Sequence, residues 1–371
     1  MKVAFLLGSA HVGGGTYVIF QHALAMVKAG WRVCIVTEER VPEGQVDWHP
    51  EAKKQLSFVT FDDVAEEQFD VAYATWWRTV YRLHRVNAKK YLYFVQSIES
   101  RFFEEWDQAA IRWADATYAY ELPTVTEARW IVEYLDKYYG RRAELARNGI
   151  RKDVYHQGVE PLAPREAGKL RVLIEGPLNV FFKNVERTVE LCASGQADEI
   201  WMMTSTKGLT RYPFCDRVFS CVPIHEAARV YASCDVVVKL SYVEGMFGPP
   251  LEMFHCGGTC VVYDVTGHDE YIRSGENGLV LQRDDEEGVV KALNTLKNER
   301  EYLHLLKENA VRTANSWPSW DQASQEFISA TNKLLDQPSP SRQSLFSWNR
   351  ALSGWYDSHV NAQSELYAQR A

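Results

Sequence analysis

Residues 2–37, KVAFLLGSAHVGGGTYVIFQHALAMVKAGWRVCIVT, contain the pattern that decides the fold. Lys2–Leu7 is a short, almost uninterrupted apolar run, which a parallel strand buried on both faces requires. The glycine-rich loop Gly8–Gly15 follows, and Tyr17–Ala29 then carries apolar residues at helical spacing. Arg32–Thr37 is a second apolar run. The order strand, loop, helix, strand predicts a βαβ unit with a right-handed crossover.

The same alternation continues along the chain. Further strand-like runs at 57–61, 71–75, 90–96 and 116–120 alternate with helical patterns such as 102–114 and 124–138. The segment Glu160–Lys169 has two prolines and no apolar periodicity, which is typical of an interdomain linker. The alternation restarts at Leu170–Glu175. We therefore expect an α/β protein with two Rossmann-like, doubly wound domains, residues 1–160 and 161–336, facing a central cleft.

Length, charge and cysteine usage limit the class of protein. The chain of 371 residues is long enough for two domains, and its formal charge of −8 has the wrong sign for a protein whose main partner is nucleic acid. The sequence has no run of ~18 apolar residues, so no membrane span is expected, and the N-terminal sequence does not resemble a signal peptide. The seven scattered cysteines form no CxxC pair, so we expect reduced thiols and no metal site. The expected location is the cytoplasm, with peripheral contact to the inner face of a membrane left open.

The most informative segment is Ser241–Gly258, SYVEGMFGPPLEMFHCGG, which places Glu244 and Glu252 eight positions apart. Gly245–Gly248 can present bare backbone N–H groups, and the helix beginning near Pro250 directs its positive end toward the same point. An anion is expected there. Glu252, in the first helical turn, is suited to accept hydrogen bonds from vicinal hydroxyls. The simpler alternative is a tight turn in which Glu252 complements the helix dipole.

At these residues the chain resembles the retaining glycosyltransferases of GT-B architecture, in particular the large family 4 (group 1 glycosyltransferases). The resemblance rests on EGMFGPPLE followed by EMFHCGG, and on HVGGGTY, RNGIRKDVY, EGPLNVFFKN and GHDEYIRSGENGLV in the same order along the chain. Gln96 stands where many members have a histidine, as in the subset that includes rhamnosyl and polysaccharide transferases. The implied fold is two Rossmann-like domains, an N-terminal acceptor domain and a C-terminal donor domain. The implied tail, 337–371, is helical and crosses back to the first domain.

The resemblance also implies roles for individual residues. Glu244 would lie beside the transferred sugar as the catalytic residue, and Glu252 would bind the ribose of a nucleotide sugar. Lys183 would bind the diphosphate; Pro177 stands where arginine is commonest, and Arg211 is a speculative helper. The remaining implied donor contacts are Gly245, Met246, Phe247 and Gly248 in the second domain and Gly14, Gly15 and Thr16 in the first.

Acceptor contacts are less defined. Gln96 cannot act as a base, and His11 and Glu99 are candidates for acceptor binding, although a lone His or Glu commonly has no special role. Because no DxD triplet occurs, neither a metal nor another cofactor is expected. The helix dipole, the backbone nest and Lys183 would stabilise the leaving diphosphate instead.

The expected function is transfer of a hexosyl or deoxyhexosyl group, with retention, from a nucleotide diphosphate sugar to a hydroxyl of a saccharide, lipid-linked or small-molecule acceptor. Two alternatives remain open: a nucleotide-sugar epimerase, which needs no acceptor, and a non-catalytic homologue that only binds the nucleotide sugar. Leu345, Trp348, Leu352 and Trp355 in the tail have helical spacing. They are expected either to be buried in the protein or to dock on another protein or a membrane surface.

Overall fold

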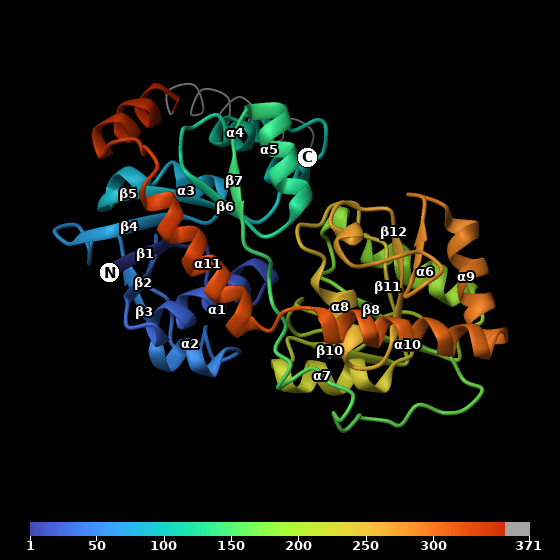
Figure 1. Ribbon diagram of the computed structural model, residues 1–371. Helices are drawn as coiled ribbons and strands as arrows, with labels where there is room; N and C mark the ends of the chain where they lie inside the picture. Colours follow the sequence, from blue (N-terminus) through green and yellow to red (C-terminus); the bar gives the residue numbers. More distant parts are fainter. Residues whose placement is uncertain (353–371) are drawn as a thin grey trace. The chain divides into compact units, whose positions relative to one another are not determined.

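The computed structural model describes residues 1–352, which divide into two compact α/β units (Figure 1). The first unit comprises Met1–His11, Gly15–Arg147 and the residues from Ser324 onward. The second comprises Val12–Gly14 and Asn148–Ala323. The first unit is therefore built from segments at both ends of the sequence.

The first unit contains a seven-stranded parallel sheet in the order β3-β2-β1-β4-β5-β6-β7. Its central strands are apolar over most of their length; four successive residues of β1, from Val3 to Leu6, have no exposed surface. The strand order reverses between β1 and β4, where doubly wound folds bind their ligands outside the carboxyl ends of the strands. The strands are β1 (Lys2–Leu6), β2 (Arg32–Thr37), β3 (Ser57–Thr60), β4 (Gln68–Ala74), β5 (Asn87–Val95), β6 (Thr124–Thr126) and β7 (Ala143–Leu145).

Helix α11 (Trp320–Leu335) covers the middle of this sheet although it comes late in the chain. Phe327 packs against the rings of Phe5 on β1 and Tyr73 on β4, and the Tyr73 hydroxyl lies 2.7 Å from Thr331 Oγ1. The other helices of this unit are α1 (Gly14–Lys28), α2 (Pro50–Gln55), α3 (Trp77–Val80), α4 (Gln108–Tyr118) and α5 (Arg129–Tyr139), with 3₁₀ turns η1 (Leu83–Arg85) and η2 (Glu99–Phe102).

The second unit contains a six-stranded parallel sheet in the order β10-β9-β8-β11-β12-β13. Its strand order reverses between β8 and β11. The strands are β8 (Arg171–Glu175), β9 (Glu199–Thr204), β10 (Arg217–Ser220), β11 (Val236–Lys239), β12 (Thr259–Tyr263) and β13 (Leu279–Leu281). The helices are α6 (Val185–Ser194), α7 (Ile224–Ser233), α8 (Gly248–His255), α9 (Glu286–Asn298) and α10 (Arg300–Ser316), with 3₁₀ turns η3 (Phe181–Lys183) and η4 (His268–Glu270).

The two parallel sheets confirm the predicted fold class, but the strand predicted at 116–120 is wrong. Residues 116–118 form the C-terminal end of helix α4, and residues 119 and 120 follow the helix. Ala114, Thr117 and Tyr118 are buried at helical spacing, and the Tyr118 hydroxyl bonds with the 97–99 turn. The actual neighbouring strand, β6, lies in the segment predicted to begin a helix at Thr124. Tertiary packing of the aromatic side chains thus decides the local structure against the apolar alternation.

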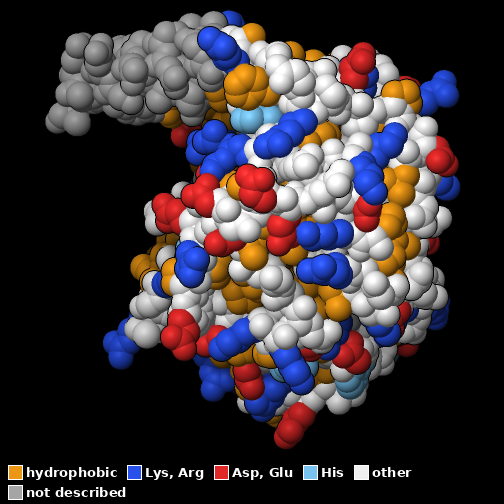
Figure 2. Space-filling model, turned by 90° about the vertical axis from the view of Figure 1, so that its left-hand side faces the viewer, with side chains coloured by type: hydrophobic (Ala, Val, Ile, Leu, Met, Phe, Trp, Pro, Cys, Tyr) orange, Lys and Arg blue, Asp and Glu red, His pale blue; other side chains and the backbone are white. Residues whose placement is uncertain are grey.

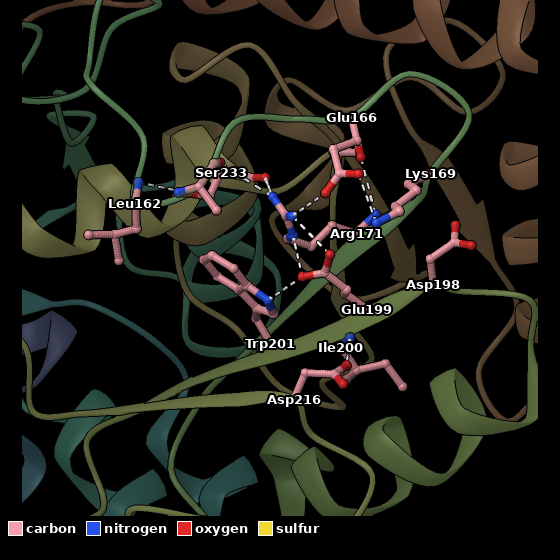
Figure 3. A network of polar contacts seen from close by, with 12 residues as sticks. Leu162, Glu166, Lys169, Arg171, Asp198, Glu199, Ile200, Trp201, Asp216 and Ser233 are labelled. Carbon is pink, nitrogen blue, oxygen red and sulfur yellow. Dashed lines mark hydrogen bonds and ion pairs between the residues drawn. The ribbon is translucent and has the colours of Figure 1, made fainter.

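The segment Glu160–Lys169, predicted to be an interdomain linker, is instead bound to the second unit (Figure 3). The Ser233 hydroxyl accepts hydrogen bonds from the N–H groups of Leu162 and Ala163. Arg165 donates to the carbonyl oxygens of Tyr231, Cys234, Cys256 and Gly257 at 2.8 to 3.3 Å. Arg171 forms a two-bond ion pair with Glu199 at 2.8 and 2.9 Å. This polar network fixes the segment at the amino end of the second sheet.

The division between the units therefore falls before residue 148 and again near residue 324, not at 160/161 and 336 as expected. Ile150 forms a bridge with Ser319, and Tyr155 packs against Tyr231 of α7, which binds 148–160 to the second unit. Residues 337–352 pack on the first unit: Ser339 bonds with the backbone of Tyr91 on β5, and the ring of Trp348 stacks on Tyr81. Trp355 and the rest of the predicted tail helix lie outside the described residues.

The face of the protein drawn in Figure 2 carries Lys and Arg side chains mixed with Asp and Glu over most of its area. All seven cysteines are free thiols. Within residues 1–352, no helix has the length and apolar character needed to cross a membrane.

Candidate functional site

Charged side chains collect at the carboxyl edge of the second sheet, where the strand order reverses. Glu175 ends β8, and Lys239 ends the adjacent strand β11. Glu244 lies in the loop between β11 and α8, and Lys183 lies in η3 before α6. We call these four residues the charge cluster. Parallel strands meet at this edge, so residues far apart in the sequence are brought together there.

Glu244 is held by two lysines. Lys183 Nζ lies 2.9 Å from both carboxylate oxygens of Glu244. Lys239 Nζ lies 3.8 Å from Glu244 Oε1 and donates hydrogen bonds to Glu175 Oε2 at 2.7 Å and to the Glu175 carbonyl oxygen at 3.0 Å. Because Lys239 is 3 % exposed and Glu244 is 7 % exposed, these charges interact with little screening by water.

The pKa values of the cluster follow from this arrangement. Burial alone would raise the pKa of Glu244, but the charges of Lys183 and Lys239 outweigh it, and the pKa lies below its ordinary value. Burial would likewise lower the pKa of Lys239, and the carboxylates of Glu175 and Glu244 reverse that effect. Glu244 is therefore ionised at neutral pH and serves as a hydrogen-bond acceptor.

Glu252 lies in α8, and its pKa is shifted upward, opposite to that of Glu244. Burial raises its pKa to about 7 and the charge of Glu175 adds to the rise, while the hydroxyls of Tyr231 and Tyr155 partly offset it. Neutral and ionised forms of Glu252 are thus both populated near neutral pH. A ligand hydroxyl that donates to this carboxylate would favour the ionised form.

In the loop from Gly245 to Gly248 the larger side chains are buried, and the backbone is the part that a ligand can contact. Met246 is 8 % exposed and Phe247 is fully buried. The Phe247 carbonyl oxygen accepts a hydrogen bond from the Tyr271 hydroxyl, which fixes the loop just before α8. A Cβ on Gly248, the first residue of α8, would meet no atom within 4 Å. Peptide groups of this loop, and not the Met246 and Phe247 side chains, are therefore available to a ligand.

Lys239 was not identified from the sequence. It ends the run DVVVK, and a lysine in that position is usually interpreted as the solvent-exposed end of an ordinary strand. The informative signal is its position, since a charged side chain at the carboxyl end of a buried parallel strand reaches the ligand edge of the sheet. Gly176 is also part of the site: its φ is +147°, and a Cβ there would lie 2.8 Å from Val185 Cγ2 and 3.6 Å from Lys239 Nζ. Arg211 lies on an exposed loop.

The predicted residues of the first unit gather at the carboxyl edge of its own sheet. A Cβ added to Gly15 would lie 3.4 Å from the Gln96 amide, and Thr16 Oγ1 donates to the Ser9 carbonyl oxygen at 3.2 Å. His11 is exposed, with its N–H bonded to Ser9 Oγ at 3.2 Å. Gly14, the first residue of α1, is counted with the second unit.

Glu99 is 6 % exposed, and Glu99 Oε2 accepts a hydrogen bond from the Trp77 N–H at 2.6 Å. Burial raises the pKa of Glu99 to about 8. In this conformation Glu99 holds the start of α3 in place. Residues 1–352 contain no group of three or more His, Cys, Asp or Glu side chains arranged to hold a metal ion.

Comparisons with known proteins give a family match within the second unit and similar folds among solved structures. Residues 217–313, which include Glu244 and Glu252, match the family model described as Glycosyl transferases group 1. Sucrose-phosphate synthase from Thermosynechococcus elongatus superposes with a TM-score of 0.73 at 15 % identity, covering 90 % of this chain and 98 % of that one. The fold is GT-B.

Other GT-B structures superpose similarly. Anabaena HepE in complex with UDP-glucose gives a TM-score of 0.71 at 16 % identity, covering 90 % of this chain and 100 % of that one. A Staphylococcus aureus TarM mutant in complex with Fondaparinux, α-GlcNAc-glycerol and UDP superposes with a TM-score of 0.68 at 9 % identity. The match covers 91 % of this chain and 100 % of that one. No curated protein matches the sequence significantly. The comparisons thus give a group 1 glycosyltransferase match over residues 217–313 and a GT-B fold for the chain.

Proposed function

We propose that this protein transfers a hexosyl or deoxyhexosyl group from a nucleotide diphosphate sugar to a hydroxyl acceptor, with retention of configuration and without a metal ion. The observation that carries the proposal is the charge cluster at the β8/β11 reversal, followed directly by the Gly245–Gly248 loop and Glu252. All of these groups except Lys183 and Glu175 lie in the segment that matches the group 1 glycosyltransferase model.

The cluster supplies the electrostatics that such a reaction needs. The side chain of Lys183 is 21 % exposed and that of Lys239 only 3 %, so Lys183 is the lysine of the cluster that can turn toward a ligand. We infer that the donor diphosphate draws Lys183 away from Glu244, while Lys239 stays in place and keeps Glu244 ionised. The developing charge on the leaving phosphate is then stabilised by Lys183 and by backbone N–H groups at the start of α8.

Glu244 then acts on the transferred sugar. As an ionised carboxylate it accepts hydrogen bonds from sugar hydroxyls and orients the anomeric carbon, and it has no proton to donate. The acceptor hydroxyl attacks from the face that the diphosphate leaves, and the departing phosphate oxygen takes the acceptor proton. This step needs positioning and charge stabilisation more than a strong protein base, which suits Gln96 at the place where related enzymes have a histidine.

Calorimetric titration with UDP, GDP and dTDP, each with and without EDTA, tests donor binding. We expect one nucleotide to bind equally well in both conditions. Failure of all three would contradict the proposal, and binding that EDTA abolishes would contradict metal independence. The bound nucleotide then defines the donors for an acceptor screen. NMR analysis of the product anomer tests retention, and conversion of the donor without acceptor would indicate an epimerase.

The Glu244→Gln variant tests the role of the carboxylate. It is expected to retain nucleotide binding and to lose turnover by about 100-fold or more, as removal of a positioned electrostatic group commonly does. Glu190→Gln is the matched control, because Glu190 is an exposed residue of α6 that pairs only with Arg187 among the described residues. Wild-type turnover by Glu244→Gln would refute the assignment.

A further inference from the structure

The segment between β12 and β13, residues 264–278, lies against the loop Gly245–Gly248, which we call the glycine loop. The segment contains most of the motif GHDEYIRSGENGLV. Strand β12 pairs with β11, and the glycine loop lies between β11 and α8. Both connections therefore start from the same carboxyl edge of the second sheet, on neighbouring strands.

The Tyr271 hydroxyl of this segment fixes a peptide group at the start of α8. It donates to the Phe247 carbonyl oxygen, which belongs to the same peptide group as the Gly248 N–H. Because a trans peptide group is planar, its N–H points away from its C=O. A carbonyl group that accepts a hydrogen bond is also polarised, which makes the N–H of its peptide a stronger donor. Tyr271 therefore sets both the direction and the donor strength of the Gly248 N–H.

The Gly248 N–H has a special position in α8. Helices have up to four N–H groups without an intrahelical partner at this end. Pro249 and Pro250 have no N–H, and the Leu251 N–H forms a hydrogen bond with the Tyr271 hydroxyl. The positive end of the α8 dipole thus acts on a ligand chiefly through the Gly248 N–H.

Tyr271 is itself held firmly within the second unit. Its buried ring lies 5.7 Å from the ring of Phe254 and 5.5 Å from that of Trp317, measured between ring centroids. The buried Asn277 amide donates to the Tyr271 carbonyl oxygen and to Thr313 Oγ1 of α10, both at 2.9 Å. Burial raises the pKa of the Tyr271 hydroxyl well above its ordinary value, so the hydroxyl keeps its proton and remains a donor.

Thr266 acts in the same way at the other end of the glycine loop. Thr266 Oγ1 donates to the Glu244 carbonyl oxygen at 3.3 Å, and that oxygen shares a peptide group with the Gly245 N–H. The Glu244 carboxylate is bound by Lys183. Glu244 is therefore fixed at its backbone as well as at its side chain.

We propose that Tyr271 and Thr266 are positioning residues of the donor site, which direct the Gly248 and Gly245 N–H groups toward the donor diphosphate. Each acts through a carbonyl oxygen next to the N–H that it directs, and not on the donor itself. The donor role rests on the proposed function, whereas the control of the Gly248 peptide group by Tyr271 does not.

NMR of protein labelled with nitrogen-15 glycine tests this control without a ligand. Gly248→Ala assigns the Gly248 resonance, because Gly248 has no positive φ and an added Cβ would meet no atom within 4 Å. Tyr271→Phe removes the hydroxyl and keeps the ring, so we expect the Gly248 amide proton to shift upfield. Tyr91→Phe is the matched control, since the buried Tyr91 hydroxyl also donates to a backbone carbonyl oxygen, that of Val86 in the first unit. This control should leave the Gly248 resonance unchanged.

Ligand binding provides the second readout. The nucleoside diphosphate that binds the wild type should bind Tyr271→Phe about ten-fold more weakly, as expected when a hydrogen bond to a charged group is weakened. The corresponding nucleoside has no phosphate and should bind both proteins equally, which separates positioning from a general loss of structure. Thr266→Val, which replaces the hydroxyl by a methyl group, should have the same selective effect. In the active enzyme both variants should raise the KM of the donor and leave the KM of the acceptor unchanged.

An unmoved Gly248 resonance in Tyr271→Phe would overturn the proposal. Unchanged diphosphate affinity in both variants, or equal losses of affinity for the diphosphate and the nucleoside, would also overturn it. If Tyr271→Phe does not fold, the same comparison of ligands in Thr266→Val decides. If the Gly248 resonance moves but no nucleotide binds the wild type, the proposed function fails and the control of the Gly248 peptide group by Tyr271 stands.

Discussion

Replacing Lys239 by methionine should raise the pKa of Glu244. Methionine retains much of the length and apolar stem of lysine but removes the charge 3.8 Å from Glu244 Oε1. At that distance two unit charges interact by about 1 kcal/mol in water and about 4 kcal/mol at the effective dielectric constant of about 20 that describes protein sites. One pKa unit corresponds to about 1.4 kcal/mol. The expected rise is therefore about 1 to 3 units, with Lys183 still bound to Glu244.

A carbon-13 NMR titration of the glutamate carboxyl groups measures this rise without knowledge of the substrate. The Glu244 resonance is assigned from Glu244→Gln. In the active enzyme, the acid limb of kcat/KM against pH should move upward by the same amount, because protonated Glu244 no longer accepts hydrogen bonds from the sugar. Lys239→Arg, which keeps the charge, should leave both titrations close to those of the wild type.

Removal of Lys239 also leaves Glu175 without the cation that lies 2.7 Å from it. A charge left unpaired in a partly buried site is destabilising, so Glu175→Gln combined with Lys239→Met serves as the companion variant. The reasoning is refuted if the Glu244 titration of either folded variant superimposes on that of the wild type. Lys239 would then serve only to neutralise Glu175.

Three further predictions concern other residues. Nucleotide affinity should increase as the pH rises through about 7, because the ribose hydroxyls favour ionised Glu252, and calorimetry of Glu252→Gln should show no such dependence. Arg165→Ala, which removes four hydrogen bonds to backbone carbonyls, should lower the free energy of unfolding in urea by about 2 to 4 kcal/mol. Arg40→Ala, at an 83 % exposed side chain, should change it by less than about 0.5 kcal/mol; similar losses would contradict the role of Arg165. Burial lowers the pKa of His22 to about 3, so the unfolded chain binds the proton more readily and stability falls as the pH drops below 6.5. By about pH 5 the loss is about 2 kcal/mol, and acid denaturation of His22→Gln should lack this part of the pH dependence.

The sequence was sufficient for the parts of the fold that depend on local periodicity. The strand predicted at Arg32–Thr37 has the same bounds in the structure, and the strand predicted at Leu170–Glu175 differs from the observed β8 by one residue. Each has a clear apolar period and turn residues at its ends. In contrast, Ala116–Tyr120 alternates small and aromatic residues in a way that suits a strand or a helix. Only the packing of Tyr118 on the 97–99 turn decides between them.

For the candidate site, too, the sequence predicted the residues that occur in local motifs and missed those that depend on long-range contacts. Glu244, Glu252 and Lys183 were predicted because they occur in short motifs, and the structure brings Lys183 onto Glu244 across 61 residues of chain. Lys239 belongs to no motif, and its pairing with Glu175 depends on which strands are neighbours. The prolines of Glu160–Lys169 indicated a linker because composition does not reveal that Arg165 finds four carbonyl oxygens in the second unit. Strand order and long-range polar contacts are properties of the folded chain.

Helix α11 has a consequence for how the protein is made. Phe327 and Thr331, which cover β1 and β4, leave the ribosome after every residue of the second unit. Until then, Phe5 and Tyr73 lack the side chains that bury them, whereas the second unit already has all of its strands and its helices α6 to α10. The unit that is synthesised first is therefore completed last. During synthesis the first sheet presents an apolar face for which a chaperone, or a neighbouring nascent chain, would compete with α11.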